Sequence, residues 1–571
     1  RVSESYYGTD EQPVISAKYC DAGAKYIKDE KGNNTELWYI GLDGEPMIRS
    51  DLGYAHVRYT YDDQGNTLTG SYMDAEDQPI VCKEGRYASY ENVYENGNRV
   101  ETRYYDTEGD LIARKDTGYA VIKLQYDQHG QKISEMYYGI AEQPVISTEY
   151  HCAGMKYAYD DKGNRTDIWY IGTDGKLIAR TDLGYAHVYR EFDLFGNKVS
   201  ERYTDTDENP VVKKEGKYAS YKDVFRDGKW VEGRYYDTEG NLVLRSDKGY
   251  AVIKLQYDEY GRRISERYYG TDESPIISNE YHCAERRFVR DATGNTTDVW
   301  FIGLDGLPMI REDWGYAHVQ YEYDIYGNES AAHYMGVDEE PAALVGGGYA
   351  SRTNAYQNNQ KTETRYYDEQ GNLILHKDKG YAVIKMLYNE FNQIISETYY
   401  DTDEQPVVST EHHCAKRSFQ YNERGYNTYI WYWGPDDQTM ERDDYGAALY
   451  YREYDDYNRR IWEVYYDRET NPVIRKDLGY AARRDTYEGN NLVKITYCDT
   501  EFQPMIYQEL GYASLVYQYN DQGQIQSIAY YDSEDKLINN KDGTAMIQYE
   551  YDEFGNVAEI FSFDQSGDLK E

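Results

Sequence analysis

Adjacent aromatic residues at regular spacing are the side chains of this sequence best suited to binding chemistry. Four pairs recur at one constant interval along the chain: Trp38-Tyr39, Trp169-Tyr170, Trp300-Phe301 and Trp431-Tyr432. Tyrosine pairs occupy the same place in other repeats, among them Tyr104-Tyr105, Tyr137-Tyr138, Tyr235-Tyr236 and Tyr268-Tyr269. Successive residues of a strand point to opposite faces, so we expect one ring of each pair in the core and one pointing outward. The outward ring either packs on the next hairpin or stacks on a sugar face or a quaternary ammonium group.

Acidic turns recur along the chain, as in Asp237-Thr238-Glu239-Gly240-Asn241 and Asp401-Thr402-Asp403-Glu404. A calcium loop of the EF-hand kind requires Glu at its twelfth position. Counted from Asp401, that position holds His412. We therefore interpret these segments as turns that begin with Asp, and we predict neither a metal site nor a cofactor.

The cysteines and the known nucleophile motifs favour no catalytic site. Cys152, Cys283 and Cys414 stand where other repeats have the Tyr of Gly-Tyr-Ala, so we expect buried thiols without disulfides. The sequence has no G-x-S-x-G and no H-E-x-x-H motif. Carboxylate pairs recur in almost every repeat, whereas a catalytic pair is normally a single constellation. We predict that this chain is not an enzyme, although a longer protein that contains it could carry a catalytic domain elsewhere.

Composition narrows the classes of partner. The 571 residues include 62 Lys and Arg against 103 Asp and Glu, a formal charge of -41, together with 70 Tyr. So many aromatic rings favour a folded protein over a disordered one. The negative charge disfavours nucleic acid and anionic membranes as partners, because both are polyanions. No stretch approaches the roughly 18 apolar residues that a membrane-spanning helix needs, so no membrane insertion is expected.

A short repeat organises the chain. Gly-Tyr-Ala begins at Gly53, Gly118, Gly184, Gly249, Gly315, Gly348, Gly380, Gly479 and Gly511, and degenerate copies fill the gaps. The steps of 32 or 33 residues define about 17 repeats, and four steps add up to a longer period of about 131 residues. This pattern predicts a single repeat region over residues 1–571, with a partial repeat at 1–21, four blocks at 22–152, 153–283, 284–414 and 415–545, and a terminal partial repeat at 546–571.

Each repeat has the pattern of a β-hairpin. In Ala251-Val252-Ile253-Lys254-Leu255-Gln256-Tyr257 the apolar residues alternate with polar ones, which is typical of a strand. A turn follows at 258–261, then a second strand at 263–269 and a short connecting strand at 276–278. The sequence thus predicts an all-β array of hairpins, wound as a solenoid or as a superhelical spiral sheet. The Gly of Gly-Tyr-Ala is expected to have a positive φ angle or to lie against another backbone segment.

Two bacterial repeat families resemble this sequence. The segments Tyr61-Asp62-Asp63-Gln64-Gly65-Asn66 and Tyr551-Asp552-Glu553-Phe554-Gly555-Asn556 resemble the YD (RHS-type) repeats that build spiral β-sheet shells. The run from Trp169 to Lys176 and on to Ala186 is similar to the aromatic and Gly-rich hairpins of choline-binding and clostridial-toxin cell-wall-binding repeats. These resemblances imply an extracellular, non-catalytic array.

The leading functional hypothesis is a multivalent binding array of a bacterial cell-surface or secreted protein. Its partner would be a glycan or a choline-decorated cell-wall polymer, held by Trp38, Tyr39, Trp169, Tyr170, Trp300, Phe301, Trp431 and Tyr432. Weak single sites gain avidity when they are repeated on a rigid array. The alternative is a structural spacer or shell without a ligand of its own. Arg1 lies inside a repeat, so we also expect the chain to be part of a longer protein that carries an enzyme or toxin domain.

Overall fold

The structure is a computed structural model and describes residues 3–7, 13, 15–16, 19–455, 457–489, 491–520, 523–551 and 557–570. Its described residues form 35 strands in one antiparallel sheet, in which strands pair with their neighbours in the chain. The predicted all-β array of hairpins is therefore confirmed. The described residues contain no helix long and apolar enough to cross a membrane.

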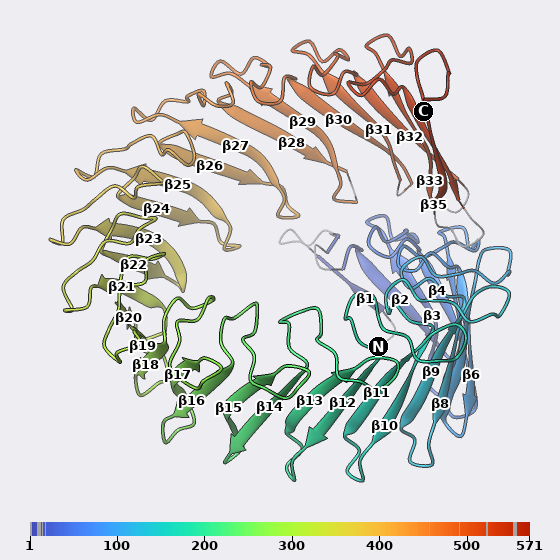
Figure 1. Cartoon of the computed structure of the whole chain (residues 1–571). Coiled ribbons are helices and arrows are strands. Elements are labelled where there is room, and N and C mark those ends of the chain that lie inside the picture. The colour runs from blue at the N-terminus through green and yellow to red at the C-terminus, as the bar shows by residue number, and fades with distance from the viewer. Residues whose placement is uncertain are drawn as a thin grey trace. The chain divides into compact units, whose positions relative to one another are not determined.

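The chain divides into two compact units. Unit 1 holds Arg1–Tyr126, Met136–Tyr150 and Arg417–Glu571, and unit 2 holds Asp127–Glu135 and His151–Lys416. The strands of unit 2 follow one another in chain order, hairpin after hairpin (Figure 1). The predicted boundaries of the four sequence blocks are not tested by this division and remain a prediction.

The strands that lie before residue 151 are β1 (Ser3–Ser5), β2 (Gly23–Lys28), β3 (Asn34–Ile40), β4 (His56–Tyr61), β5 (Thr67–Met73), β6 (Ser89–Glu95), β7 (Asn98–Tyr105), β8 (Val121–Tyr126) and β9 (Lys132–Tyr138). The next strands are β10 (Gly154–Tyr159), β11 (Arg165–Ile171), β12 (His187–Phe192), β13 (Lys198–Thr204), β14 (Ser220–Arg226), β15 (Lys229–Tyr236), β16 (Val252–Tyr257), β17 (Arg263–Tyr269), β18 (Glu285–Arg290), β19 (Thr296–Ile302), β20 (His318–Tyr323), β21 (Glu329–Met335), β22 (Ser351–Gln357), β23 (Gln360–Tyr367), β24 (Val383–Tyr388) and β25 (Ile394–Tyr400). The last strands are β26 (Lys416–Tyr421), β27 (Asn427–Trp433), β28 (Leu449–Tyr454), β29 (Arg460–Tyr466), β30 (Ala482–Glu488), β31 (Asn491–Cys498), β32 (Ser514–Tyr519), β33 (Ile525–Tyr531), β34 (Met546–Tyr551) and β35 (Val557–Phe563).

The hairpin of β16 and β17 shows how one repeat folds. Ile253 and Leu255 are buried and Gln256 is exposed, as the period of two predicts, whereas Val252 on the opposite face is also fully buried. A β-bulge between Gln256 and Tyr257 ends the regular pairing just before the turn. After β17 the chain turns back, and its link to the strand is the single bridge of Tyr269 with Pro275. The connecting segment at 276–278 is therefore irregular and not the short strand that we predicted.

The tyrosine of the Tyr-Asp or Tyr-Asn motif ties many of the hairpins to the hairpin before them. The hydroxyl of Tyr61 donates to the carbonyl oxygen of Asn34 at 2.7 Å. The carboxylate of Asp62 accepts the backbone N–H groups of Gln64 and Asn66, at 2.9 and 2.8 Å. The same hydroxyl bond joins Tyr159 to Lys132, Tyr257 to Trp230, Tyr323 to Thr296, Tyr388 to Lys361, Tyr454 to Asn427, Tyr519 to Leu492 and Tyr551 to Ile525. Of the second quoted motif, residues 552–556 lie outside the described residues.

The connecting loops cover one face of the sheet and bind one another. In unit 1 the buried rings of Tyr480, Tyr497 and Tyr512 pack against Leu478 and Leu510 of the loops. Successive loops share one backbone hydrogen bond, as between the N–H of Asn279 and the carbonyl oxygen of Lys248 at 3.1 Å. Equivalent bonds join Lys83 to Leu52, Lys115 to Gly85, Thr148 to Thr117, Lys214 to Leu183, Ser246 to Gly216, Val345 to Trp314, Lys377 to Gly347, Thr410 to Lys379, Lys476 to Tyr445 and Lys541 to Leu510. The core lies between the sheet and these loops.

The Gly of Gly-Tyr-Ala has the predicted left-handed conformation. Gly249 has a φ of 75°, and a Cβ added there would lie 2.7 Å from the backbone nitrogen of Asn279 in the next loop. Lys217 stands at this position in another repeat and keeps a positive φ of 54°. A side chain is therefore tolerated only where the neighbouring loop leaves room for it.

We expect Gly249→Val to lower the free energy of unfolding by about 1–3 kcal/mol, because a β-branched residue both strains this φ angle and collides with the next loop. Urea titration measures the effect. Lys217→Gly is the matched control at the same repeat position, and it should change stability little. Equal stability of the Gly249 variant and the parent would contradict the interpretation.

Replacing Tyr257 by Phe removes one hydroxyl bond to the preceding hairpin and leaves the ring in place. We expect a loss of about 0.5–1.5 kcal/mol in the free energy of unfolding. Tyr260→Phe serves as the control, because Tyr260 lies at the exposed tip of the same hairpin. A loss of the same size in both variants would show that the bond to Trp230 is not the cause.

Candidate functional site: aromatic clusters on the two faces of the sheet

The inward rings of the strands alternate with the tyrosines of Gly-Tyr-Ala in ladders beneath the connecting loops. In unit 1, neighbouring rings lie 4.5–6.2 Å apart, from Tyr39 through Tyr54, Tyr72, Tyr87, Tyr104, Tyr119 and Tyr137 to Tyr150. In unit 2 the same contacts run from Tyr170 through Tyr185, Tyr203, Tyr218, Tyr235, Tyr250 and Tyr268 to Tyr281. A third ladder joins Phe301, Tyr316, Tyr334, Tyr349, Tyr366, Tyr381, Tyr399 and His412. Edge-on and offset contacts at such distances stabilise aromatic pairs beyond the burial of their area.

Each ladder starts at a stacked arginine. The guanidinium carbon of Arg49 lies 4.5 Å from the ring centroid of Tyr39, and Asp51 holds the same guanidinium at 2.6 Å. Arg180, Arg311 and Arg442 repeat this arrangement over Tyr170, Phe301 and Tyr432. Each of the three ladders ends near the place where Cys replaces the Tyr of Gly-Tyr-Ala. Cys152, Cys283 and Cys414 are fully buried, as predicted for small core residues.

The structure places the aromatic pairs one residue out of the register that we predicted. The backbone N–H of Tyr39 bonds to the carbonyl oxygen of Ala55, and that of Tyr104 bonds to the equivalent oxygen of Ala120. Tyr39 therefore corresponds to Tyr104, and Trp38 corresponds to Arg103. The tryptophans do not occupy the place of either tyrosine of a Tyr-Tyr pair.

The outward tryptophan rings stack on histidines of the next strand. Trp38 of β3 lies opposite His56 of β4, with ring centroids 3.6 Å apart and an angle of 13° between the planes. Trp300 and His318 repeat the contact at 3.6 Å and 10°. Trp169 and His187 repeat it at 4.8 Å and 14°. One face of each of these tryptophans is thus covered by the neighbouring hairpin, which is the packing role that we weighed against a ligand platform.

A carboxylate completes each of these clusters. Nε2 of His318 lies 2.9 Å from Oδ1 of Asp298, and His187 has the same contact with Asp167. His318 is 3% exposed. Burial lowers the pKa of His318 below its ordinary value, although the nearby Asp298 carboxylate opposes this effect. The histidine is therefore held in its neutral form as part of the packing.

The fourth tryptophan has lost this environment. Trp431 lies opposite Leu449 and stacks on Tyr429 of its own strand, with centroids 5.0 Å apart. Both the histidine and the acid of the earlier blocks are thus replaced by apolar or aromatic residues. The histidine clusters could have been predicted from sequence, because each His follows its Trp at the same interval in three blocks.

Two repeats further on, the same face carries ion pairs. Arg103 contacts Glu142 at 2.8 Å and also pairs with Glu101, and Lys123 lies 3.4 Å from Glu101. The network recurs around Arg234 and Arg365, which pair with Glu232 and Glu273 and with Glu363 and Glu404. Glu101 thus pairs with Arg103 of its own strand and with Lys123 of the next strand, and Glu142 pairs with Arg103 from the turn after β9.

The acidic turns that we considered as metal loops bind backbone groups. The carboxylate of Asp237 accepts the N–H groups of Glu239 and Asn241 at 2.9 and 2.8 Å, and Asp401 does the same for Asp403 and Gln405. These hydrogen bonds lower the pKa of Asp237. The turn geometry accounts for the acidic residue.

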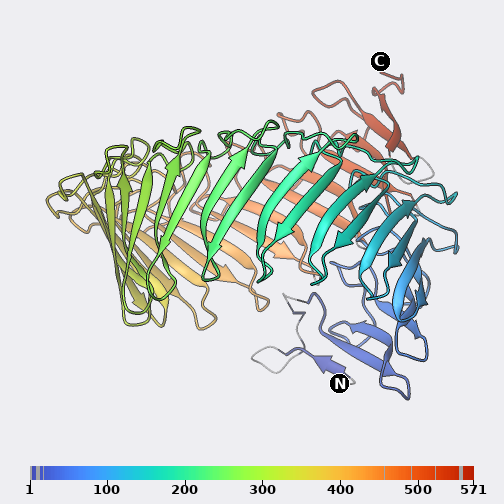
Figure 2. The ribbon, with the colours of Figure 1, turned by 60° about the horizontal axis from the view of Figure 1, so that its bottom comes forward.

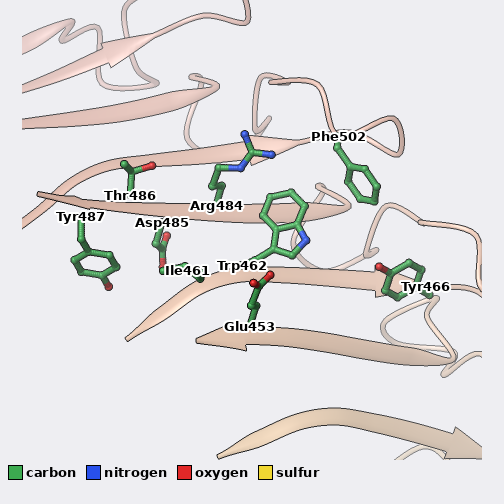
Figure 3. A pocket seen from close by; sticks show the side chains of 9 residues that line it. All are labelled: Glu453, Ile461, Trp462, Tyr466, Arg484, Asp485, Thr486, Tyr487 and Phe502. Carbon is green, nitrogen blue, oxygen red and sulfur yellow. The ribbon is translucent and has the colours of Figure 1, made fainter. Parts of the chain in front are cut away.

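A pocket of about 590 Å³ in unit 1 breaks the repeat pattern (Figure 3). Trp462 lines this pocket, and the guanidinium carbon of Arg484 lies 4.8 Å from the centroid of the indole. The ring centroids of Phe502 and Trp462 are 5.5 Å apart. Phe502 has a φ of 62°, at a turn position where Gly240 stands in another block. Trp462 replaces the Ser that other repeats carry, such as Ser265, and this departure is the sequence signal that we missed. Both rings pack on the buried cluster of Val464, Ala482 and Cys498.

Comparisons with known proteins give similarity of fold alone. No protein-family model matches the chain, and no curated protein matches it. The crystal structure of TcdB2-TccC3-Cdc42 has 11% identity and a TM-score of 0.33, and the match covers 95% of this chain and 28% of that one. The crystal structure of TcdB2-TccC3 has 13% identity and a TM-score of 0.35, and the match covers 96% of this chain and 29% of that one. The Photorhabdus luminescens Tc holotoxin pore has 12% identity and a TM-score of 0.35, and the match covers 95% of this chain and 28% of that one. This chain spans less than a third of those chains, and no residue role is transferred from them.

The ring ladders confirm the tyrosine-rich character of the predicted repeats, and the family resemblance to YD-type arrays stays a prediction. The resemblance to choline-binding and cell-wall-binding repeats gains no support from the comparisons. The role of the eight predicted binding residues is not tested by either the fold or the matches, and it stays a prediction.

Protonation of His318 should destabilise the fold. Because its pKa is lowered in the folded state, the unfolded chain binds more protons as the pH falls below about 6.5, and stability is lost in that window. The free energy of unfolding measured at pH 7 and pH 5 should fall less in His318→Gln than in the parent. His129→Gln, at an exposed hairpin tip, is the control and should keep the parent's pH dependence. An identical pH dependence in His318→Gln and the parent would contradict this account.

Proposed function

We propose that this chain is a structural β-repeat wall of a larger bacterial protein, and that its aromatic rings and ion pairs serve to join repeats. The observation that carries the proposal is the use of the rings. The inward ring of each pair lies in a ladder under the loops, as Tyr39 and Tyr170 do at 7% and 5% exposure. The outward ring of three blocks is stacked on a histidine.

The polar edge of the first tryptophan is occupied as well. Nε1 of Trp38 donates to the carboxylate of Glu36 at 3.0 Å. A sugar or a quaternary ammonium group needs an accessible ring face and polar groups free to bind it. Trp38 offers one ring face at most, and its indole N–H already has an acceptor.

The same reasoning applies to the charges of this face. Arg103, Arg234 and Arg365 are each held by two glutamates, one two residues earlier on the same strand and one in the turn that follows the next hairpin. These ion pairs join each arginine to the following repeat and leave few free charges for a polymer. The proposal includes an extracellular location, which the resemblance to YD repeats implies.

Binding and stability measurements separate the wall from a binding array. We expect the parent protein to bind neither choline nor the sugars of a glycan array or bacterial cell-wall preparations. We expect the triple replacement of Trp169, Trp300 and Trp431 by Ala to lower the free energy of unfolding, by about 1–3 kcal/mol for each half-buried ring that packs on a neighbour. Full stability of the triple variant, together with binding by the parent that the variant lacks, would overturn the proposal in favour of the ligand platform.

A further inference from the structure

The hairpin tips of unit 2 expose large apolar side chains. Leu194, Phe195, Ile325 and Tyr326 are 82%, 87%, 92% and 74% exposed. The turns need only Asp at the first position and Gly at the fourth, and the two residues between them are free to vary. In the first block that place holds Asp63 and Gln64. Apolar residues gathered at exposed tips mark a contact surface.

The equivalent tip in unit 1 shows what such a residue contacts. Phe195, Tyr326 and Tyr457 follow one another at the long period of the sequence. Tyr457 is 37% exposed, and it lines a cavity of about 420 Å³ together with Leu42 and Ile48 of a connecting loop. One of three equivalent aromatic tips thus lies across a small cavity from a loop of another repeat.

Neighbouring tips of unit 1 lie against loops in the same way. Gly489, at the tip of the β30–β31 hairpin, lines the same cavity. Gly523 belongs to the next tip, and a Cβ added to it would lie 2.7 Å from a guanidinium nitrogen of Arg86. In unit 1, therefore, three consecutive hairpin tips lie against loop segments within 41–48 and 76–86.

Unit 2 also carries an exposed copy of the loop seat. Leu304 and Ile310 correspond to Leu42 and Ile48 two long periods earlier in the chain, and they are 56% and 45% exposed. Leu307 lies between them and is 62% exposed. Hairpin turns line one edge of these strands and connecting loops line the other (Figure 2). Unit 2 thus has both halves of the contact that unit 1 makes, and both are uncovered.

We propose that the tips at Phe195 and Tyr326 dock on the loop seat at Leu304 and Ile310 of a second copy of this chain. The argument is the cavity of unit 1, where a tip of this type and a loop of this type face each other. In the proposed contact the tips of one copy bind the seat of the next copy, so the contact is heterologous and association continues beyond a dimer. Each copy carries a formal charge of -41, and salt screens the repulsion between copies. Association is therefore stronger at high salt. The inference does not rest on the proposed structural function, since a ligand-binding array could associate by the same edges.

Sedimentation velocity over a wide range of protein and salt concentration tests the proposal. We expect the parent to associate increasingly with concentration and salt. The double variant Phe195→Ser with Tyr326→Ser should weaken the association at least about tenfold, and Leu304→Ser with Ile310→Ser should do the same. All four side chains are exposed, so the unfolding midpoints should match that of the parent. Gln64→Ser is the matched control at the equivalent tip of the first block, and it should associate like the parent.

Mixing the two double variants identifies the partner surface. The tip variant keeps its seat and the seat variant keeps its tips, so an equimolar mixture should recover one contact and form a dimer that does not grow further. A parent that stays monomeric at all concentrations and salt levels overturns the proposal. So does an associating seat variant beside a monomeric tip variant, because the tips would then meet a different surface.

Discussion

A single hairpin of this repeat cannot bury an apolar face by itself, and the rest of the structure depends on that constraint. Each hairpin presents half a core, and the next hairpin supplies the other half. The ring ladders are the physical form of this dependence, because each tyrosine contacts one ring before it and one after it in sequence. The hydroxyl bond of Tyr257 and the loop bond of Asn279 act between the same neighbours. Stability is therefore a sum of contacts between adjacent repeats.

The same constraint explains where the many tyrosines and acidic residues lie in the structure. Seventy tyrosines and an excess of acid would serve well in a binding surface, yet the rings lie between repeats and the carboxylates bind turns or basic side chains. His318 illustrates the outcome, because its neutral ring is held between an indole and a carboxylate with almost no access to solvent. Residue types that suggest chemistry in isolation here join neighbouring repeats.

The sequence predicts local structure well because local structure depends on one repeat. The alternation around Ile253 predicts the strand, and the position of Gly249 predicts its positive φ angle. Contacts between strands depend on register, which composition does not specify. Trp38-Tyr39 and Tyr104-Tyr105 look alike as aromatic pairs, yet the backbone bonds to Ala55 and Ala120 place them one residue apart. With a period of two, that single step exchanges the buried face for the open one.

Contacts between distant repeats are still harder to predict, since they depend on the twist summed over many hairpins. Leu42 and Tyr457 belong to the first and the last of the four sequence blocks and line one cavity, and no pattern within a repeat implies this. The long period of the sequence nevertheless helps to find such contacts, because it identifies the equivalent residues in other blocks once one contact is known. Phe195, Tyr326 and Tyr457 occupy the same hairpin-tip position in three blocks, and all three are aromatic. Turn geometry alone does not require an aromatic residue there, because the first block has Gln64 at this position. Tyr457 faces Leu42 and Ile48 across a cavity, and we propose the same kind of contact for the exposed Phe195 and Tyr326.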